Sequence, residues 1–149
     1  MRRSSASAVL IAVLLLVTGC NLDRQPALAT VRIRDASIAF SVEIAQTPEQ
    51  QRDGLSHRTE LTTGTGMLFR FNQLQTQQVW MADMSFPIDA AWIADGTIVA
   101  TRTLQPCTDN EPTQCPRWTS PEPVDALLEV PAHSLSAVQP GMSVTITQP

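Results

Sequence analysis

The chain has 149 residues, of which 43% are hydrophobic, with ten basic and fourteen acidic side chains and a formal net charge of −4. A mildly acidic chain without a cluster of Lys or Arg lacks the electrostatic features of a nucleic-acid-binding protein, so no nucleic-acid partner is expected. Three Cys and two His offer few metal ligands. We therefore predict neither a metal site nor any other cofactor.

The first 19 residues have the pattern of a targeting segment. Two arginines are followed by an apolar core over residues 8–17 and by Val17-Thr18-Gly19-Cys20. This tetrapeptide resembles a bacterial lipobox, in which small residues admit the signal peptidase and the thiol of Cys20 receives lipid. The apolar core is shorter than the about 20 residues of a membrane-spanning helix. We predict a lipoprotein signal peptide over residues 1–19; a transmembrane anchor or an ordinary signal peptide is the alternative.

A flexible tether is expected after this segment. Residues 20–30 show no hydrophobic periodicity, so they are predicted to hold the domain away from the lipid surface. The predicted location is therefore the cell envelope, with the membrane as a partner through the lipid on Cys20. Asn21, directly after that Cys, matches the outer-membrane-directed pattern of Gram-negative lipoproteins, which would place the domain in the periplasm.

The rest of the chain, residues 31–148, is predicted to be one domain made mainly of short strands. Apolar and polar residues alternate along residues 31–34 and 38–44, which indicates two half-buried strands. Short apolar or β-branched segments predict further strands at residues 66–71, 79–81, 88–93, 97–104, 126–130 and 142–147. This pattern favours a compact antiparallel β-sandwich or barrel-like domain.

One or two short helices are expected beside these strands. Thr47, Pro48 and Gln50 carry the signals of a helix start, and Gly54 carries that of its end. A single turn of helix is expected within residues 131–138.

Two Cys lie in the Pro-rich residues 105–123, which are predicted to form a long irregular loop. In an oxidising compartment the simplest interpretation is a disulfide between Cys107 and Cys115. A metal or redox pair is the alternative, but the spacing is not Cys-x-x-Cys and both His lie far away in the sequence.

The central part of the chain carries short motifs in a fixed order. They are Arg52, Gly54-Leu55 and Arg58; Gly66-Met67-Leu68-Phe69 and Phe71; and Val79-Trp80-Met81, Asp83 and Pro87-Ile88-Asp89. The series is similar to that of the domain-of-unknown-function 192 (DUF192) family over residues 30–146, here in a lipoprotein-type member with a signal peptide. The resemblance implies a compact, mostly β domain and no established activity. Asp83 stands where the family commonly has Asn.

The candidate ligand-binding residues are Arg52, Arg58, Trp80, Asp83 and Asp89. A loop held between strands is a common place for a site, and Trp80 offers a flat apolar surface. Each residue also has a structural interpretation: the Trp as core, Asp89 as an acceptor for backbone N–H groups, and the arginines and Asp83 in ion pairs that support the fold.

Three functions are consistent with these residues. The favoured one is a binding or accessory module of the envelope that takes a small polar ligand or an envelope protein through residues 80–89. The alternative is a hydrolase of an envelope substrate, with Asp83 and Asp89 as an acid/base pair. The third is a purely structural domain. An enzyme is the less favoured class, because the sequence has no Gly-x-Ser-x-Gly, no His-Glu-x-x-His and no phosphate-binding Gly loop.

Overall fold

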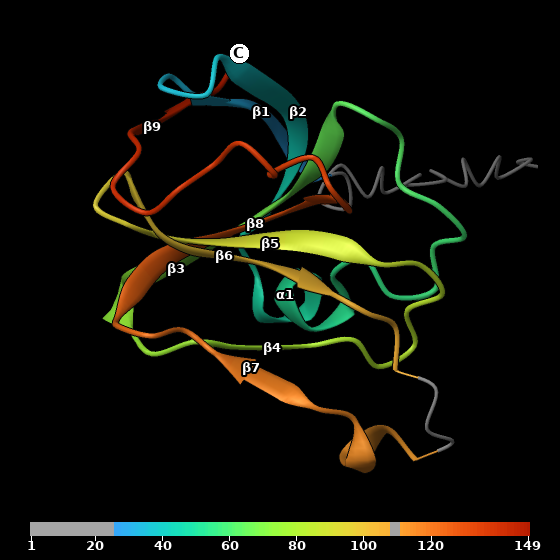
Figure 1. Cartoon of the computed structure of the whole chain (residues 1–149). Helices are drawn as coiled ribbons and strands as arrows, with labels where there is room; N and C mark the ends of the chain where they lie inside the picture. The colour runs from blue at the N-terminus through green and yellow to red at the C-terminus, as the bar shows by residue number, and fades with distance from the viewer. Residues whose placement is uncertain (1–25, 108–110) are drawn as a thin grey trace, which may run out of the picture.

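Seven strands form one strongly curled sheet, and two further strands form a separate pair beside it (Figure 1). The computed structural model describes residues 26–107 and 111–149. The sheet consists of β1 (Ala27–Ile33), β2 (Ile38–Ala45), β3 (Thr65–Gln75), β5 (Ile88–Ala94), β6 (Thr97–Leu104), β8 (Val124–Pro131) and β9 (Val144–Thr147). The pair consists of β4 (Gln78–Trp80) and β7 (Arg117–Thr119), and the helical elements are α1 (Pro48–Asp53) and the 3-10 helix η2 (Pro112–Gln114). The predicted mainly β class is confirmed.

The strands of the large sheet follow the order β6-β5-β8-β3-β2-β1-β9. All neighbours are antiparallel except β2 and β3, which run parallel from Ser41 opposite Thr65 to Ala45 opposite Phe69. The expected antiparallel sheet is therefore wrong for this one pair. A parallel pair needs a long crossover between its strands. Residues 46–64, which contain α1, supply it.

The curl brings the two edges of the sheet together at one end. Thr97 of β6 forms a bridge with Ser143, directly before β9. The backbone N–H of Ile98 donates to the carbonyl of Met142 at 2.9 Å, and that of Val144 donates to Gly96 at 2.8 Å. These bonds satisfy backbone groups that an open sheet leaves unpaired, which limits its free edges.

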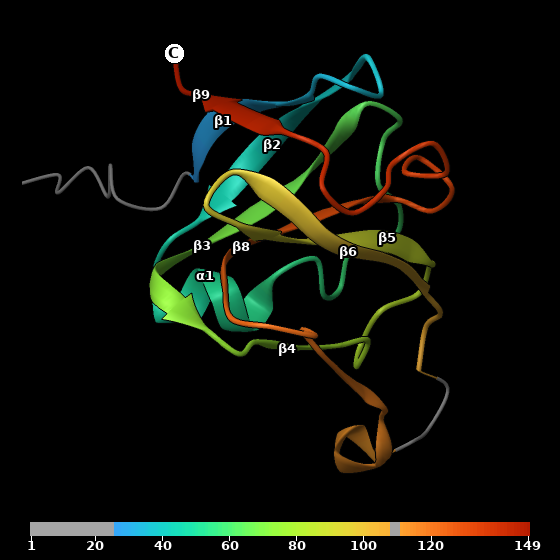
Figure 2. The same cartoon turned by 60° about the vertical axis from the view of Figure 1, so that its left-hand side comes forward.

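The central strands are buried on both faces, as their nearly continuous apolar runs require. Alternate side chains of β5 and β8 enter two clusters. Val31, Ile44, Leu68 and Leu128 belong to the first cluster, inside the curl. The second contains Met67, Phe69, Trp92 and Leu127 on the other face. In Figures 1 and 2, α1 lies between this second face and the β4–β7 pair.

Several boundaries differ from those expected. β1 begins at Ala27 because it pairs with β2 from Ile44 onward, so residues 27–30 are strand and not tether. β3 continues through polar residues to Gln75, and β7 lies inside the segment expected to be irregular. Of the residues 131–138, where one turn of helix was expected, Pro131 ends β8 and residues 132–137 form hydrogen-bonded turns without a helix. The predicted signal peptide and Cys20 lie outside the described residues.

The disulfide prediction is confirmed: Cys107 and Cys115 are bonded, with their Cα atoms 5.6 Å apart. Within residues 26–107 and 111–149, no helix has the length and apolar character needed to cross a bilayer.

Candidate functional site

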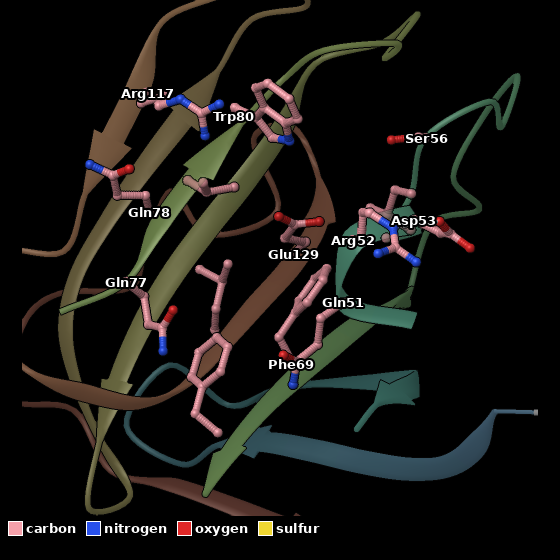
Figure 3. A pocket seen from close by; sticks show the side chains of 15 residues that line it. Gln51, Arg52, Asp53, Ser56, Phe69, Gln77, Gln78, Trp80, Arg117 and Glu129 are labelled. Carbon is pink, nitrogen blue, oxygen red and sulfur yellow. Dashed lines mark ion pairs between the residues drawn. The ribbon is translucent and has the colours of Figure 1, made fainter. Parts of the chain in front are cut away.

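A cavity of about 310 Å³ lies between α1, β3, β8 and the β4–β7 pair (Figure 3). Its lining includes Gln51, Arg52, Phe69, Gln77, Trp80, Arg117 and Glu129, and we call it the Glu129 cavity. The volume falls at the lower end of the range of about 300–1,000 Å³ that is usual for small-molecule sites.

The wall formed by α1 is held by local hydrogen bonds, because this short helix buries none of its residues. The Thr47 hydroxyl accepts from the backbone N–H of Gln50, whose side chain accepts from that of Thr47, which completes a capping box. Nε2 of Gln51 donates to the carbonyl of Arg70 at 2.7 Å and so fastens the helix to β3. The chain is thereby fixed where Arg52 reaches the edge of the cavity.

The opposite wall is formed by the β4–β7 pair. Trp80 pairs with Arg117, whose guanidinium carbon lies 4.1 Å from the centre of the indole ring. Such a cation–π contact contributes about 0.5–1 kcal/mol at an exposed site. Two hydrogen bonds with Ser120 fix the backbone of Gln77. The N–H of Gln77 donates to Oγ of Ser120 at 3.0 Å, and the backbone N–H of Ser120 donates to the carbonyl of Gln77 at 2.8 Å. These contacts hold Trp80 and Gln77 against the cavity.

Glu129 lies at the centre of the cavity, on the central strand β8 (Figure 3). It is 5% exposed, and its cross-strand neighbours are Met67 of β3 and Ala90 of β5. No described residue donates a hydrogen bond to its carboxyl group or pairs with it as a cation. Burial raises its pKa from 4.5 to about 8. The carboxyl group is therefore mostly protonated at neutral pH and has both a donor and an acceptor to offer.

Two further buried polar atoms lack partners in the described part of the chain. They are Nε2 of Gln77, on the cavity wall, and Nε1 of Trp92, in the second cluster. A buried donor without an acceptor costs about 1–3 kcal/mol. Of these groups, the carboxyl group of Glu129 faces the cavity with its hydrogen-bonding capacity unused, whereas Nε2 of Gln77 has almost no accessible surface.

Of the five predicted site residues, two line this cavity: Arg52 and Trp80. Arg58 instead forms a bidentate ion pair with Glu43 of β2, with N–O distances of 2.7 and 2.9 Å. Hydrogen bonding to Arg58 lowers the pKa of Glu43. The structural interpretation of Arg58 as an ion-pair partner thus describes its observed contacts.

The two predicted aspartates lie on different sides of the sheet. Asp83 is exposed in a loop between β4 and β5, next to Met81 and Met84 of the second cluster. Asp89 is 4% exposed and points the other way, where it accepts from the Thr103 hydroxyl at 2.7 Å and the Leu135 N–H at 2.9 Å. The structure does not bring the two carboxylates into one site, and Asp89 stabilises the turn before β9.

Sequence reasoning did not select Glu129, Gln77 or Arg117. Glu129 is 5% exposed and lines the cavity. A single Glu within the apolar run of residues 127–130 was the available signal, because such a strand is buried on both faces. Gln77 and Arg117 had no local signal, since their positions depend on pairing between β4 and β7.

The molecule is thus a mainly β domain with a cavity of ligand size into which a buried carboxyl group faces. The family model DUF192, described as uncharacterized ACR, matches residues 29–146. The chain therefore belongs to the DUF192 family. No curated protein matches it.

Two solved structures share the fold. A protein of Sinorhizobium meliloti 1021, named provisionally as a transcription regulator, is 30% identical with a TM-score of 0.70, over 81% of this chain and 95% of that one. A protein of unknown function from Novosphingobium aromaticivorans DSM 12444 is 25% identical with a TM-score of 0.68, over 97% of this chain and 98% of that one. Neither description names a ligand.

Proposed function

We propose that this domain is a binding module that takes a small polar ligand into the Glu129 cavity. The observation that supports the proposal is the carboxyl group of Glu129, which is 5% exposed, faces the cavity and has no partner among the described residues. Burying an unpartnered polar group costs free energy, and an apolar residue on this strand would avoid that cost. A ligand that supplies the missing hydrogen bonds accounts for its presence.

The placement of the other polar groups supports the same function. Arg52 and Arg117 also line the cavity and carry donors. The rest of the lining is mixed, with apolar side chains such as Phe69 and Leu127 beside polar ones such as Gln51 and Ser56. Apolar contacts combined with a few convergent polar groups are usual in a small-ligand site.

The test is a titration of the purified protein with small probes of several charge classes, followed by ¹H–¹⁵N NMR. The probes are methyl glucoside, glucuronate, glycine, ethanolamine and phosphate. At least one probe is expected to shift the indole signal of Trp80 and the side-chain amide of Gln77, and a Glu129→Leu variant should lose the effect. Glu122→Gln, an exposed change in the loop before β8, is the matched control. If every probe leaves both signals unchanged in the folded parent, the cavity is not a binding site for these classes.

We further propose that the domain works at the cell envelope, held by lipid on Cys20. The support is the lipobox-like Val17-Thr18-Gly19-Cys20 after an apolar core. Membrane fractionation of cells expressing the full chain tests this. The parent is expected in the membrane fraction with a lipid-sized mass increase on Cys20, and Cys20→Ala in the soluble fraction. An unmodified Cys20 in the parent would contradict the proposal.

A further inference from the structure

The unpartnered carboxyl group of Glu129 restricts what a ligand must present. In its protonated form it needs one acceptor for its O–H and one donor for its carbonyl oxygen. A hydroxyl group both donates and accepts, so neighbouring hydroxyls on one molecule can satisfy both needs. A ligand with only acceptors leaves the carbonyl oxygen unpaired, and one with only donors leaves the O–H unpaired.

Charge at the cavity argues against a cationic ligand. Arg52 and Arg117 both line it, and among the described lining residues the one carboxylate besides Glu129 is Asp53, 4.0 Å from Arg52. A cation would have to enter past two guanidinium groups, ionise Glu129 and form an ion pair at a buried position. The desolvation cost of such a pair is several kcal/mol per ion. A neutral ligand avoids this cost.

The shape and lining suit one ring. The indole of Trp80 and the apolar side chains of Phe69 and Leu127 provide flat or apolar contacts, while the carboxyl group of Glu129 provides a polar one. A pyranose has the same division, with C–H groups on its faces and hydroxyls on its rim. The volume of about 310 Å³ is small for a site and suits a single unit.

We infer that the Glu129 cavity binds a single neutral sugar unit, with adjacent hydroxyl groups hydrogen-bonded to the carboxyl group of Glu129. This inference rests on the proposed binding function and specifies its ligand class. Glu129 acts as a neutral acid in the complex, and Arg52 and Arg117 exclude cations.

The experiment measures dissociation constants of the full chain for the methyl glycosides of glucose, galactose, mannose and N-acetylglucosamine, with glycine and ethanolamine as charged comparisons. At least one glycoside is expected to bind. Its affinity should change less than about threefold in Glu129→Gln, because an amide also donates and accepts, and should fall at least tenfold in Glu129→Leu. Glu122→Gln should match the parent, and circular dichroism should show each variant folded.

The pH profile provides a second readout. If only the protonated Glu129 binds, the affinity of the parent should fall about tenfold between pH 7 and pH 9, because the pKa of the free carboxyl group is about 8. Glu129→Gln should show no such fall.

The outcomes separate this inference from the proposed function. Binding of glycine or ethanolamine alone, abolished in Glu129→Gln, would overturn the sugar inference and leave the binding function standing. If another class of probe binds and none of the glycosides does, the sugar inference is likewise overturned and the binding function stands. If no compound of any class binds the folded parent, both fall.

Discussion

Burial makes the carboxyl group of Glu129 hold its proton more tightly in the folded chain than in the unfolded chain, because its pKa rises from 4.5 to about 8. Between these values the unfolded chain ionises this group while the folded chain keeps it protonated. The free energy of unfolding should therefore fall as pH rises from about 5 to about 8, by up to ~1.4 kcal/mol per pH unit from this residue alone. Urea denaturation at several pH values checks this.

The variant Glu129→Gln should lose that slope, since an amide does not titrate. Glu43→Gln is the control of opposite sign. Hydrogen bonding to Arg58 lowers the pKa of Glu43. The stability that ionised Glu43 contributes is therefore present above pH 4.5 and is lost as pH falls below that value. Removing Glu43 should leave the slope between about pH 5 and about pH 8 unchanged. An equal slope in the parent and in Glu129→Gln would mean that the carboxyl group is not desolvated.

At the scale of one element, α1 depends on its cap because none of its residues is buried. Thr47→Ala removes the acceptor of the Gln50 N–H and should cost about 1 kcal/mol of stability. Because α1 forms one wall of the Glu129 cavity, ligand affinity should fall as well. Thr63→Ala, in the exposed loop before β3, is the control and should change stability by less than about 0.5 kcal/mol. Equal effects of the two variants on denaturation would contradict the role of the cap.

The β4–β7 pair is a second element whose order depends on few contacts. The disulfide between Cys107 and Cys115 closes a short loop just before β7. Replacing both Cys by Ser should lower the free energy of unfolding by about 2–3 kcal/mol, because the unfolded chain gains conformational freedom. Hydrogen exchange should rise in β4 and β7, while β3, β5 and β8 in the central sheet remain protected. Uniform loss of protection across all strands would show instead that the pair and the sheet open together.

At the scale of the whole molecule, the sequence predicts the elements better than their pairing. Strand positions follow from alternation, and the start of α1 follows from Thr47 and Pro48, because these signals are local. The parallel β2–β3 pair and the β4–β7 pair bring together distant segments, so no local pattern specifies them. The same limit applies to the site. Trp80 was selected for its residue type, whereas the signal of Glu129 was its place within an apolar run, which is typical of a strand buried on both faces.

The pairing of β3 with β8 connects the large sheet to the Glu129 cavity, because Glu129 lies on β8 opposite Met67 of β3. A Cβ on Gly66 would overlap the backbone carbonyl of Glu129 and lie 2.9 Å from Cγ1 of Val130. The carbonyl belongs to the central strand β8 and cannot move alone, so Gly66→Ala should cost about 3 kcal/mol, at the upper end of overpacking effects, and displace Glu129.

Gly64→Ala is the matched comparison. Gly64 has open space around it but a φ of +80°, so an alanine there should cost about 1 kcal/mol from backbone strain alone. Urea denaturation of both variants gives the two costs, and the pH slope assigned to Glu129 reports whether its surroundings have changed. A Gly66→Ala variant no less stable than Gly64→Ala, with the slope intact, would mean that β8 moves independently of β3. In that case strand pairing in the sheet would not fix the position of Glu129. A bound ligand would then have to hold its carboxyl group in place.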